Sequence, residues 1–131
     1  MPKVNCIVVT PEKTALEQSC DFLALPLFDG EIGIAGDHSP MIGRLGYGEM
    51  RIKENGEQLR FYVDGGFVQV ADNVVAVITN RAIPAAELDT NTIESQLAEA
   101  RSQPSNSPEL MESRDRSIAQ ARAQLRVAGR Q

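Results

Sequence analysis

With 131 residues, of which 42% are hydrophobic and 24% charged, the chain has the composition of a soluble globular domain with a short appendage, which excludes disorder throughout. The net charge of -5 argues against nucleic acid as the main partner, because neutralising phosphates requires a basic face. The apolar runs are far shorter than the roughly 18 residues of a membrane span, and no signal-peptide pattern opens the chain. We therefore expect a cytoplasmic protein.

Short β-rich segments come first. Val4–Val9 predicts a strand that ends at Thr10-Pro11. Two more short strands are expected at Lys13–Gln18 and Asp21–Leu25. Because Pro26 has no N–H to donate, we expect it to end the third strand. Two isolated cysteines, which lack CxxC spacing, predict buried reduced thiols rather than a zinc site or a disulfide framework.

The segment Phe28–Leu45 alternates glycines with aliphatic residues and contains the only histidine of the chain. Gly30, Gly33 and Gly36, at three-residue spacing, fit neither an amphipathic helix nor an uninterrupted strand. They predict a tight, irregular rim, which the aliphatic residues pin to a core beneath it. We expect a partner to lie against the outer side of this rim.

A hairpin follows the glycine segment. Tyr47–Lys53 places Met50 and Ile52 on one face and its charged residues on the other. Asn55-Gly56 is a strong hairpin signal, so Gln58–Val63 is expected to be the partner strand.

Two further strands are predicted after this hairpin. Asp64-Gly65-Gly66 predicts a turn or bulge before the strand Phe67–Ala71. A turn at Asp72-Asn73 then leads into Val74–Thr79. Because Val74–Ile78 is apolar on both pleat faces, we expect one face to be covered by its own sandwich and the other by a helix or a partner. Strands of this length and spacing predict an all-β sandwich or barrel.

The composition changes at Pro84, after which Ala, Glu, Gln and Arg replace the β-branched runs. Ile93, Leu97 and Ala100 recur at helical spacing, and Asp89 is a suitable N-cap for that helix. The chain therefore divides into a β domain, residues 1–84, and a helical hairpin, residues 85–131.

The second helix follows the Pro- and Ser-rich segment Ser102–Pro108. Ser107 is expected to cap it, with Pro108 at the first helical position and Gly129 at the end. Its stripe is expected at Met111, Arg114, Ile118, Ala121 and Leu125. Because Ala-rich stripes bury little apolar area, the hairpin should be only marginally stable when isolated. It should therefore dock on its own sandwich or on another protein.

Catalytic and metal-binding constellations are not evident in the sequence, and no cofactor is expected. Asp37-His38-Ser39 has the residue types of a hydrolytic triad, but adjacent positions can hardly supply the required geometry. A surface loop is the favoured interpretation, and a small hydrolase that uses Asp37 and His38 is the alternative. The glycines of Gly43–Gly48 precede a strand rather than a helix, which argues against a phosphate cradle.

The last nineteen residues are locally basic, with five arginines against Asp115. Two interpretations of this basic helix remain open: a solvated face, or a surface whose forked donors pair with an acidic partner or with phosphate. The arginines concerned are Arg114, Arg116, Arg122 and Arg126.

Two long motifs resemble those of one family. The first is Gly30–Ile34 with Gly36–Pro40, similar to G-E-[ILF]-G-[IV]-x-x-x-H-[AS]-P, and the second is Val63–Val70 followed by Asn73–Ile78. Val8–Glu12 and Ala121–Arg126 match as well. At this separation the motifs resemble those of the epsilon subunit of bacterial rotary ATP synthases, called delta in mitochondria.

The resemblance implies a β-sandwich of about ten short strands followed by an antiparallel two-helix hairpin. It implies a non-catalytic rotor subunit in the central stalk of a proton-translocating ATP synthase, on the cytoplasmic face of the membrane. There the sandwich joins the gamma subunit to the c-ring. Gly30 and Glu31 would face the c-ring, and Thr10, His38 and Gly43 would face gamma.

The hairpin in this family folds onto the sandwich or extends along gamma, where basic residues meet an acidic segment of the catalytic beta subunits and hinder ATP hydrolysis. The resemblance assigns this inhibitory role to Arg114, Arg116, Arg122 and Arg126.

Some members of the family bind ATP between the two helices through an [IL]-D-x-x-R-A motif and arginines of the second helix. Here Asp89 is kept, while Thr92 and Ile93 replace the Arg-Ala pair. With Arg122 and Arg126 as the remaining candidates, we expect ATP binding to be weak or absent. An ATP-sensing regulatory module is the alternative function.

Overall fold

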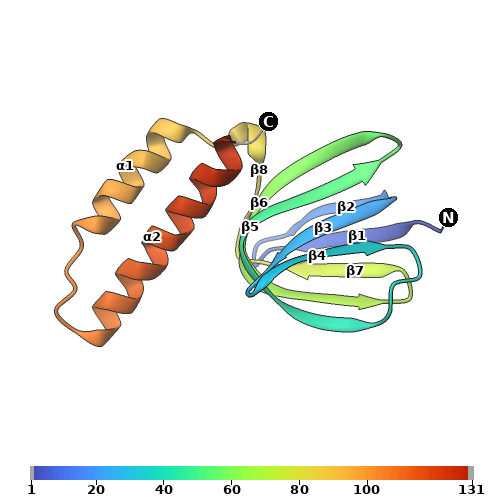
Figure 1. Cartoon of the computed structure of the whole chain (residues 1–131), viewed down its shortest axis with the longest axis horizontal. Coiled ribbons are helices and arrows are strands. Elements are labelled where there is room, and N and C mark those ends of the chain that lie inside the picture. The colour runs from blue at the N-terminus through green and yellow to red at the C-terminus, as the bar shows by residue number, and fades with distance from the viewer. Residues whose placement is uncertain (1, 130–131) are drawn as a thin grey trace.

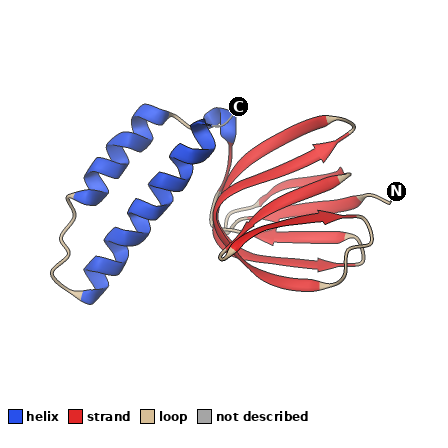
Figure 2. Cartoon of the chain, viewed as in Figure 1, coloured by secondary structure: helices blue, strands red, loops and turns tan. Residues whose placement is uncertain are grey.

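The computed structural model describes residues 2–129, which form a β-sandwich followed by two antiparallel helices (Figures 1 and 2). The strands are β1 (Val4–Val9), β2 (Thr14–Cys20), β3 (Phe22–Leu27), β4 (Gly30–Ala35), β5 (Met41–Glu54), β6 (Glu57–Ala71), β7 (Val74–Ile78) and β8 (Ala82–Pro84). A short 3-10 turn, η1 (Ala85–Glu87), leads to helices α1 (Thr90–Arg101) and α2 (Pro108–Gly129). The predicted fold class is confirmed, with eight strands over residues 2–129 where about ten were expected.

One continuous hydrogen-bonded sheet folds over to form both layers. Its strand order is β2-β1-β7-β6-β5-β3-β4, with β8 beside β6. β5 pairs with β6 along its whole length, across the predicted Asn55-Gly56 turn. β7 pairs with the second half of β6 only, and β8 with the first half. The two long strands therefore belong to both layers.

Two glycines explain why β6 runs as one strand through Asp64-Gly65-Gly66, where a turn or a bulge was expected. Gly65 and Gly66 have φ values of +74° and +106°, which an L side chain rarely adopts. Before them, Val63 points into the core, and after them Val68 and Val70 do. The alternation has thus moved by one residue, so Asp64-Gly65-Gly66 redirects the strand without ending it.

The predicted glycine rim is wrong, because Gly30–Ala35 forms the regular strand β4, paired antiparallel with β3. A Cβ at Gly33 would lie 2.7 Å from the ring of Phe22, and one at Gly36 would overlap the backbone of Pro2. Close packing against neighbours, and not an irregular path, accounts for these two glycines.

The prediction that Pro26 ends a strand is also wrong, since β3 continues to Leu27. The pairing of β3 with β5 is irregular between Ala24 and Leu27, which accommodates a residue without an N–H. Gly48 on β5 leaves room for the proline, since a Cβ there would lie 2.9 Å from the Pro26 Cβ.

The sandwich has a core of its own. Its fully buried side chains come from the strands alone and include Val4, Val8, Leu23, Leu25, Ile34, Met50, Ile52, Val63, Val68, Val75 and Val77. Cys6 and Cys20 belong to the same core as free thiols, as predicted. The helices add only small clusters beside this core.

Both helix starts are as predicted. The Asp89 carboxylate accepts hydrogen bonds from the backbone N–H groups of Asn91 and Thr92, and Ser107 Oγ accepts one from Leu110 N–H at 3.2 Å. Ile93, Leu97 and Ala100 form the buried stripe of α1.

The predicted stripe of α2 is wrong in part. Ile118, Ala121 and Leu125 pack against α1, but Met111 is 46% exposed. A second buried face, which includes Ala123 and Val127, was not predicted. α2 therefore has two partners, and Figure 1 shows it lying between α1 and the sandwich.

Candidate interaction sites

The hairpin packs on one outer face of the sandwich, which we call the docking face. It consists of Tyr47, Glu49 and Arg51 on β5 and Arg60, Tyr62 and Asp64 on β6. α2 covers it with Ala123 and Val127, which form a buried apolar cluster with Tyr62. Glu49, which the sequence places on the charged face of its strand, is only 4% exposed.

Asp64 connects the docking face to α2, although it is only 4% exposed. Its carboxylate accepts hydrogen bonds from Tyr62 Oη at 2.6 Å, from Arg81 Nε at 2.9 Å and from Gln120 Nε2 at 3.1 Å. Its backbone N–H donates to Thr79 Oγ1. Burial, and then the hydrogen bond to Asp64, raises the pKa of Tyr62, so the phenol remains a donor.

A row of alternating charges crosses the docking face. Glu49 accepts from Arg51 Nη1 at 3.1 Å and from Arg60 Nε at 2.8 Å. Arg51 also pairs with Glu31 on β4 at 2.8 Å, which raises the pKa of its guanidinium. Arg60 Nη2 donates to the carbonyl oxygen of Val127 at 2.7 Å. The row therefore leads from β4 to the last turn of α2.

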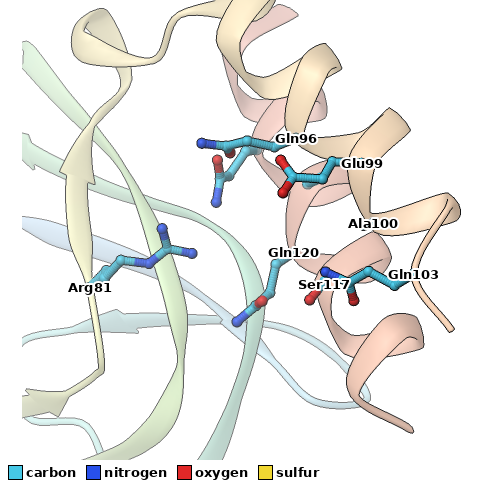
Figure 3. A pocket seen from close by; sticks show the side chains of 9 residues that line it. Arg81, Gln96, Glu99, Ala100, Gln103, Ser117 and Gln120 are labelled. Carbon is cyan, nitrogen blue, oxygen red and sulfur yellow. The ribbon is translucent and has the colours of Figure 1, made fainter. Parts of the chain in front are cut away.

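A polar cleft of about 280 Å³ lies where the two helices meet the sandwich (Figure 3). Arg81 extends toward it from the sandwich side, and Gln120 lies opposite on α2. The other lining residues are Gln96, Glu99, Ala100, Gln103, Ser117, Ala121 and Gln124.

The predicted nucleotide residues do not line this cleft. Asp89 serves as the N-cap of α1, and Arg122 is exposed. Arg126 instead lines a smaller cleft beside Gly30 and Glu31, where the end of α2 meets the turn between β3 and β4.

A second outer face, which we call the apolar face, consists of Ile42, Phe67, Val74 and Ile78. Their exposed fractions are 75%, 56%, 38% and 49%. Phe67 pairs directly with Ile78, whereas Ile42 lies opposite Gln69 and Val74 lies opposite Ala71. The register therefore places all four side chains on the same outer side of β5, β6 and β7. Within residues 2–129, neither helix covers the outer side of β7, where Val74 and Ile78 stay exposed.

The three residues predicted to face gamma lie around this patch in different ways. Thr10 follows Val9, which pairs with Ile78 at one end of β7. His38 lies toward the other end, in a loop held by hydrogen bonds between Asp37 and Asn73. Gly43 is on β5, but a side chain there would point inward.

Gly30 and Glu31, predicted to face the c-ring, begin β4 directly after a tight turn. Phe28 in that turn is 67% exposed, and the Arg44 guanidinium lies 4.3 Å from the centre of its ring. The Glu31 side chain is half exposed despite its ion pair with Arg51. The turn and the start of β4 thus expose an aromatic ring and a carboxylate.

The predicted inhibitory arginines are at the surface of α2. Arg114 pairs with Asp115 at 3.2 Å, and Arg116 pairs with Glu112 at 3.8 Å. Surface ion pairs of this kind contribute little to stability. Arg122 and Arg126 are exposed on the same helix.

The polar loop Asp37-His38-Ser39 does not have the geometry of a triad. Asp37 is held by Asn73, and His38 Nδ1 bonds to the Ser39 carbonyl oxygen at 2.8 Å. Within residues 2–129, no group of three or more His, Cys, Asp or Glu side chains is placed to hold a metal ion.

Sequence reasoning missed most of the docking face. The sequence indicates only a turn or bulge at Asp64 and a charged strand face at Glu49. Arg60, Arg81 and Gln120 carried no signal beyond their polarity. The second apolar face of α2, at Ala123 and Val127, was the signal that could have indicated a docked helix.

Comparisons with known proteins agree with this architecture. Residues 3–85 match the family model described as ATP synthase, Delta/Epsilon chain, beta-sandwich domain. The ATP synthase epsilon chain of Rhodopirellula baltica is 49% identical over 125 residues, 95% of this chain and 98% of the relative. The ATP synthase epsilon chain of Granulibacter bethesdensis is 36% identical over 101 residues, which are 76% of this chain and 75% of that relative. In fold, a chain of the Euglena gracilis mitochondrial ATP synthase superposes with a TM-score of 0.84 at 20% identity, covering 94% of this chain and 80% of that one.

A β-sandwich with its own core, followed by a pair of helices docked on one of its faces, defines a class of small proteins built from a β domain and a helical hairpin. Within that class, the extent of these matches is decisive, and the chain belongs to the ATP synthase delta/epsilon family. Neither helix of the described part of the chain is long and apolar enough to cross a membrane.

Proposed function

We propose that the chain is a non-catalytic rotor subunit of a proton-translocating ATP synthase, which couples the gamma subunit to the c-ring and restrains ATP hydrolysis. The apolar face carries this proposal, because a patch of four large side chains exposed on a closed sandwich fits a protein interface. The sandwich, residues 1–84, is the coupling part, and the hairpin, residues 85–131, is the regulatory part. The subunit would be a peripheral part of the complex, on the cytoplasmic face of the membrane.

The contacts proposed for gamma are Thr10, His38 and Gly43 around the apolar face. For the c-ring they are Gly30 and Glu31, beside the exposed ring of Phe28. A sandwich with a close-packed core suits this role, because transmitting torque requires a stiff body.

Restraint of hydrolysis is assigned to the hairpin. Arg114, Arg116, Arg122 and Arg126 are proposed to meet acidic side chains of the catalytic beta subunits when the hairpin extends. The weak surface ion pairs of Arg114 and Arg116 support this, because they can be exchanged at little cost.

Reconstitution with the catalytic core tests the proposal. ATP hydrolysis is compared between the full-length chain and a chain that ends at Pro84, which keeps the strands and their core. We expect faster hydrolysis without the hairpin, and equal rates would contradict the inhibitory role. Co-sedimentation of both chains with the core is the control, since both should bind through the apolar face.

A further inference from the structure

The boundary between the hairpin and the sandwich is unusual in its chemistry. Its apolar cluster is small, with Tyr62, Ala123 and Val127 as the buried members. Two carboxylates, Glu49 and Asp64, are each only 4% exposed beside it. Burying a charge is unfavourable unless it is paired. The free-energy cost of undocking the hairpin therefore depends on whether each carboxylate is paired by residues of the sandwich or by residues of α2.

The partners of Asp64 come mainly from the sandwich. Tyr62, Arg81 and the Thr79 hydroxyl all belong to β6 or to the segment that follows β7. Gln120 is its partner from α2. When α2 departs, Asp64 therefore keeps its ion pair with Arg81 and its hydrogen bond from Tyr62. Water can replace the side-chain amide of Gln120.

Glu49 is arranged in the same way. Arg51 and Arg60, both on the sandwich, hold its carboxylate. The link to the helix is made by Arg60, which donates to the Val127 carbonyl oxygen in the last turn of α2. Carbonyl groups at a helix C-terminus lack partners within the helix, and the helix dipole favours a cation there.

From this arrangement we propose a two-point polar latch that holds the hairpin in the docked position. One point is Asp64 with Gln120, and the other is Arg60 with Val127. Because each buried carboxylate is already paired from the sandwich side, the latch opens without leaving an uncompensated charge. The docked hairpin is thus held by replaceable hydrogen bonds and a small apolar contact.

The latch concerns the isolated chain, and its connection to hydrolysis rests on the proposed function. A low-stability docked element suits regulation, because local opening then requires far less free energy than unfolding the sandwich. The charge row from Glu31 ends at the second latch point, so the proposed c-ring contact and the docked helix share one set of ion pairs.

Hydrogen exchange of the full-length chain tests the first point. Gln120→Ala removes the helix-side donor and leaves the sandwich unchanged. We expect backbone amides of α2 to exchange about threefold to tenfold faster, the loss typical of one hydrogen bond, while β-strand amides keep their rates. Gln96→Ala is the matched control, because Gln96 lies in the same cleft on α1. Equal α2 rates in the wild-type and Gln120→Ala chains would overturn the first point.

Arg60→Lys tests the second point while retaining a positive charge beside Glu49. A lysine ammonium cannot reproduce the fork that reaches both Glu49 and Val127. We expect faster exchange in the last turn of α2 at an unchanged unfolding midpoint of the sandwich. Unchanged exchange in that turn would overturn the second point.

The Gln120→Ala chain is also added to the reconstituted catalytic core. If its α2 exchanges faster but hydrolysis is unaffected, the latch stands and the inhibitory role of the hairpin fails. If neither exchange nor hydrolysis changes, the latch is overturned, while the Pro84 truncation still tests the proposed function separately.

Discussion

Arg60 on β6 donates a 2.7 Å hydrogen bond to the carbonyl oxygen of Val127, in the last turn of α2. The same guanidinium binds the buried carboxylate of Glu49. One side chain of the sandwich therefore serves both its own layer and the docked helix.

The bend of β6 should be intolerant of a side chain at Gly66. A Cβ there would lie 1.9 Å from the Ile78 carbonyl oxygen, and the φ of +106° is strained for any L residue. We expect Gly66→Ala to lower the free energy of unfolding by at least about 3 kcal/mol, measured by urea denaturation. Gly56→Ala is the control, because its φ is also positive but a Cβ meets open space. Its expected loss is about 1–2 kcal/mol, and equal losses would contradict the steric argument.

Stability should fall in alkaline solution because of Cys6. Burial, with the neighbouring Cys20 adding to it, raises the pKa of the Cys6 thiol from 9.0 to about 12. Between these values the folded chain keeps a proton that the unfolded chain releases, so stability is complete below about pH 9 and is lost as the pH rises. One such group gives a slope of about 1.4 kcal/mol per pH unit.

The measurement is the free energy of unfolding at several values between about pH 8 and about pH 10.5. Cys6→Ala should be less stable than the wild type near pH 8, because it leaves a cavity. Its slope should nevertheless be shallower than that of the wild type. Parallel slopes for the two chains would show that the thiol does not titrate as argued.

Local signals explain which parts of the fold were predictable. The caps at Asp89 and Ser107 and the turn at Asn55-Gly56 depend on a few adjacent residues, and each lies where the sequence indicated. The β4 strand and the course of β3 through Pro26 depend on neighbours across the sheet. Spacing alone could not show that Gly33 accommodates Phe22 or that Gly48 accommodates Pro26.

The docking face was unpredictable for a similar reason. Glu49 alternates with the core residue Met50 as a solvated side chain would, but the fold places it in a cleft beside the end of α2. The weak Ala-rich stripe did indicate that the hairpin must dock on something. It could not indicate which face, because Ala123 and Val127 matter only through their contact with Tyr62.

Nucleotide binding is expected to be weak or absent. Thr92 stands where the ATP-binding pattern has an arginine, and the Asp89 carboxylate already accepts two backbone hydrogen bonds as an N-cap. Calorimetric titration of the full chain with Mg-ATP should therefore show no micromolar binding. Thr92→Arg, at an exposed position, adds a forked donor for phosphate and is expected to increase affinity. Micromolar binding by the wild-type chain would favour the ATP-sensing module instead.

Association with gamma should depend on the apolar face and not on exposed apolar side chains in general. Phe67 is 56% exposed and lies beside Ile78 on that face, so Phe67→Glu would bury a charge in the proposed interface. We expect at least about a tenfold loss of affinity for the gamma-containing core, measured with the core immobilised on a sensor surface, and an unchanged unfolding midpoint.

Leu59→Glu is the matched control, since Leu59 is 40% exposed on the other half of β6, near the Asn55-Gly56 turn. Because Leu59 lies outside the apolar face, its substitution should leave affinity within about twofold of the wild type. Equal losses for the two variants would mean that gamma binds elsewhere on the sandwich.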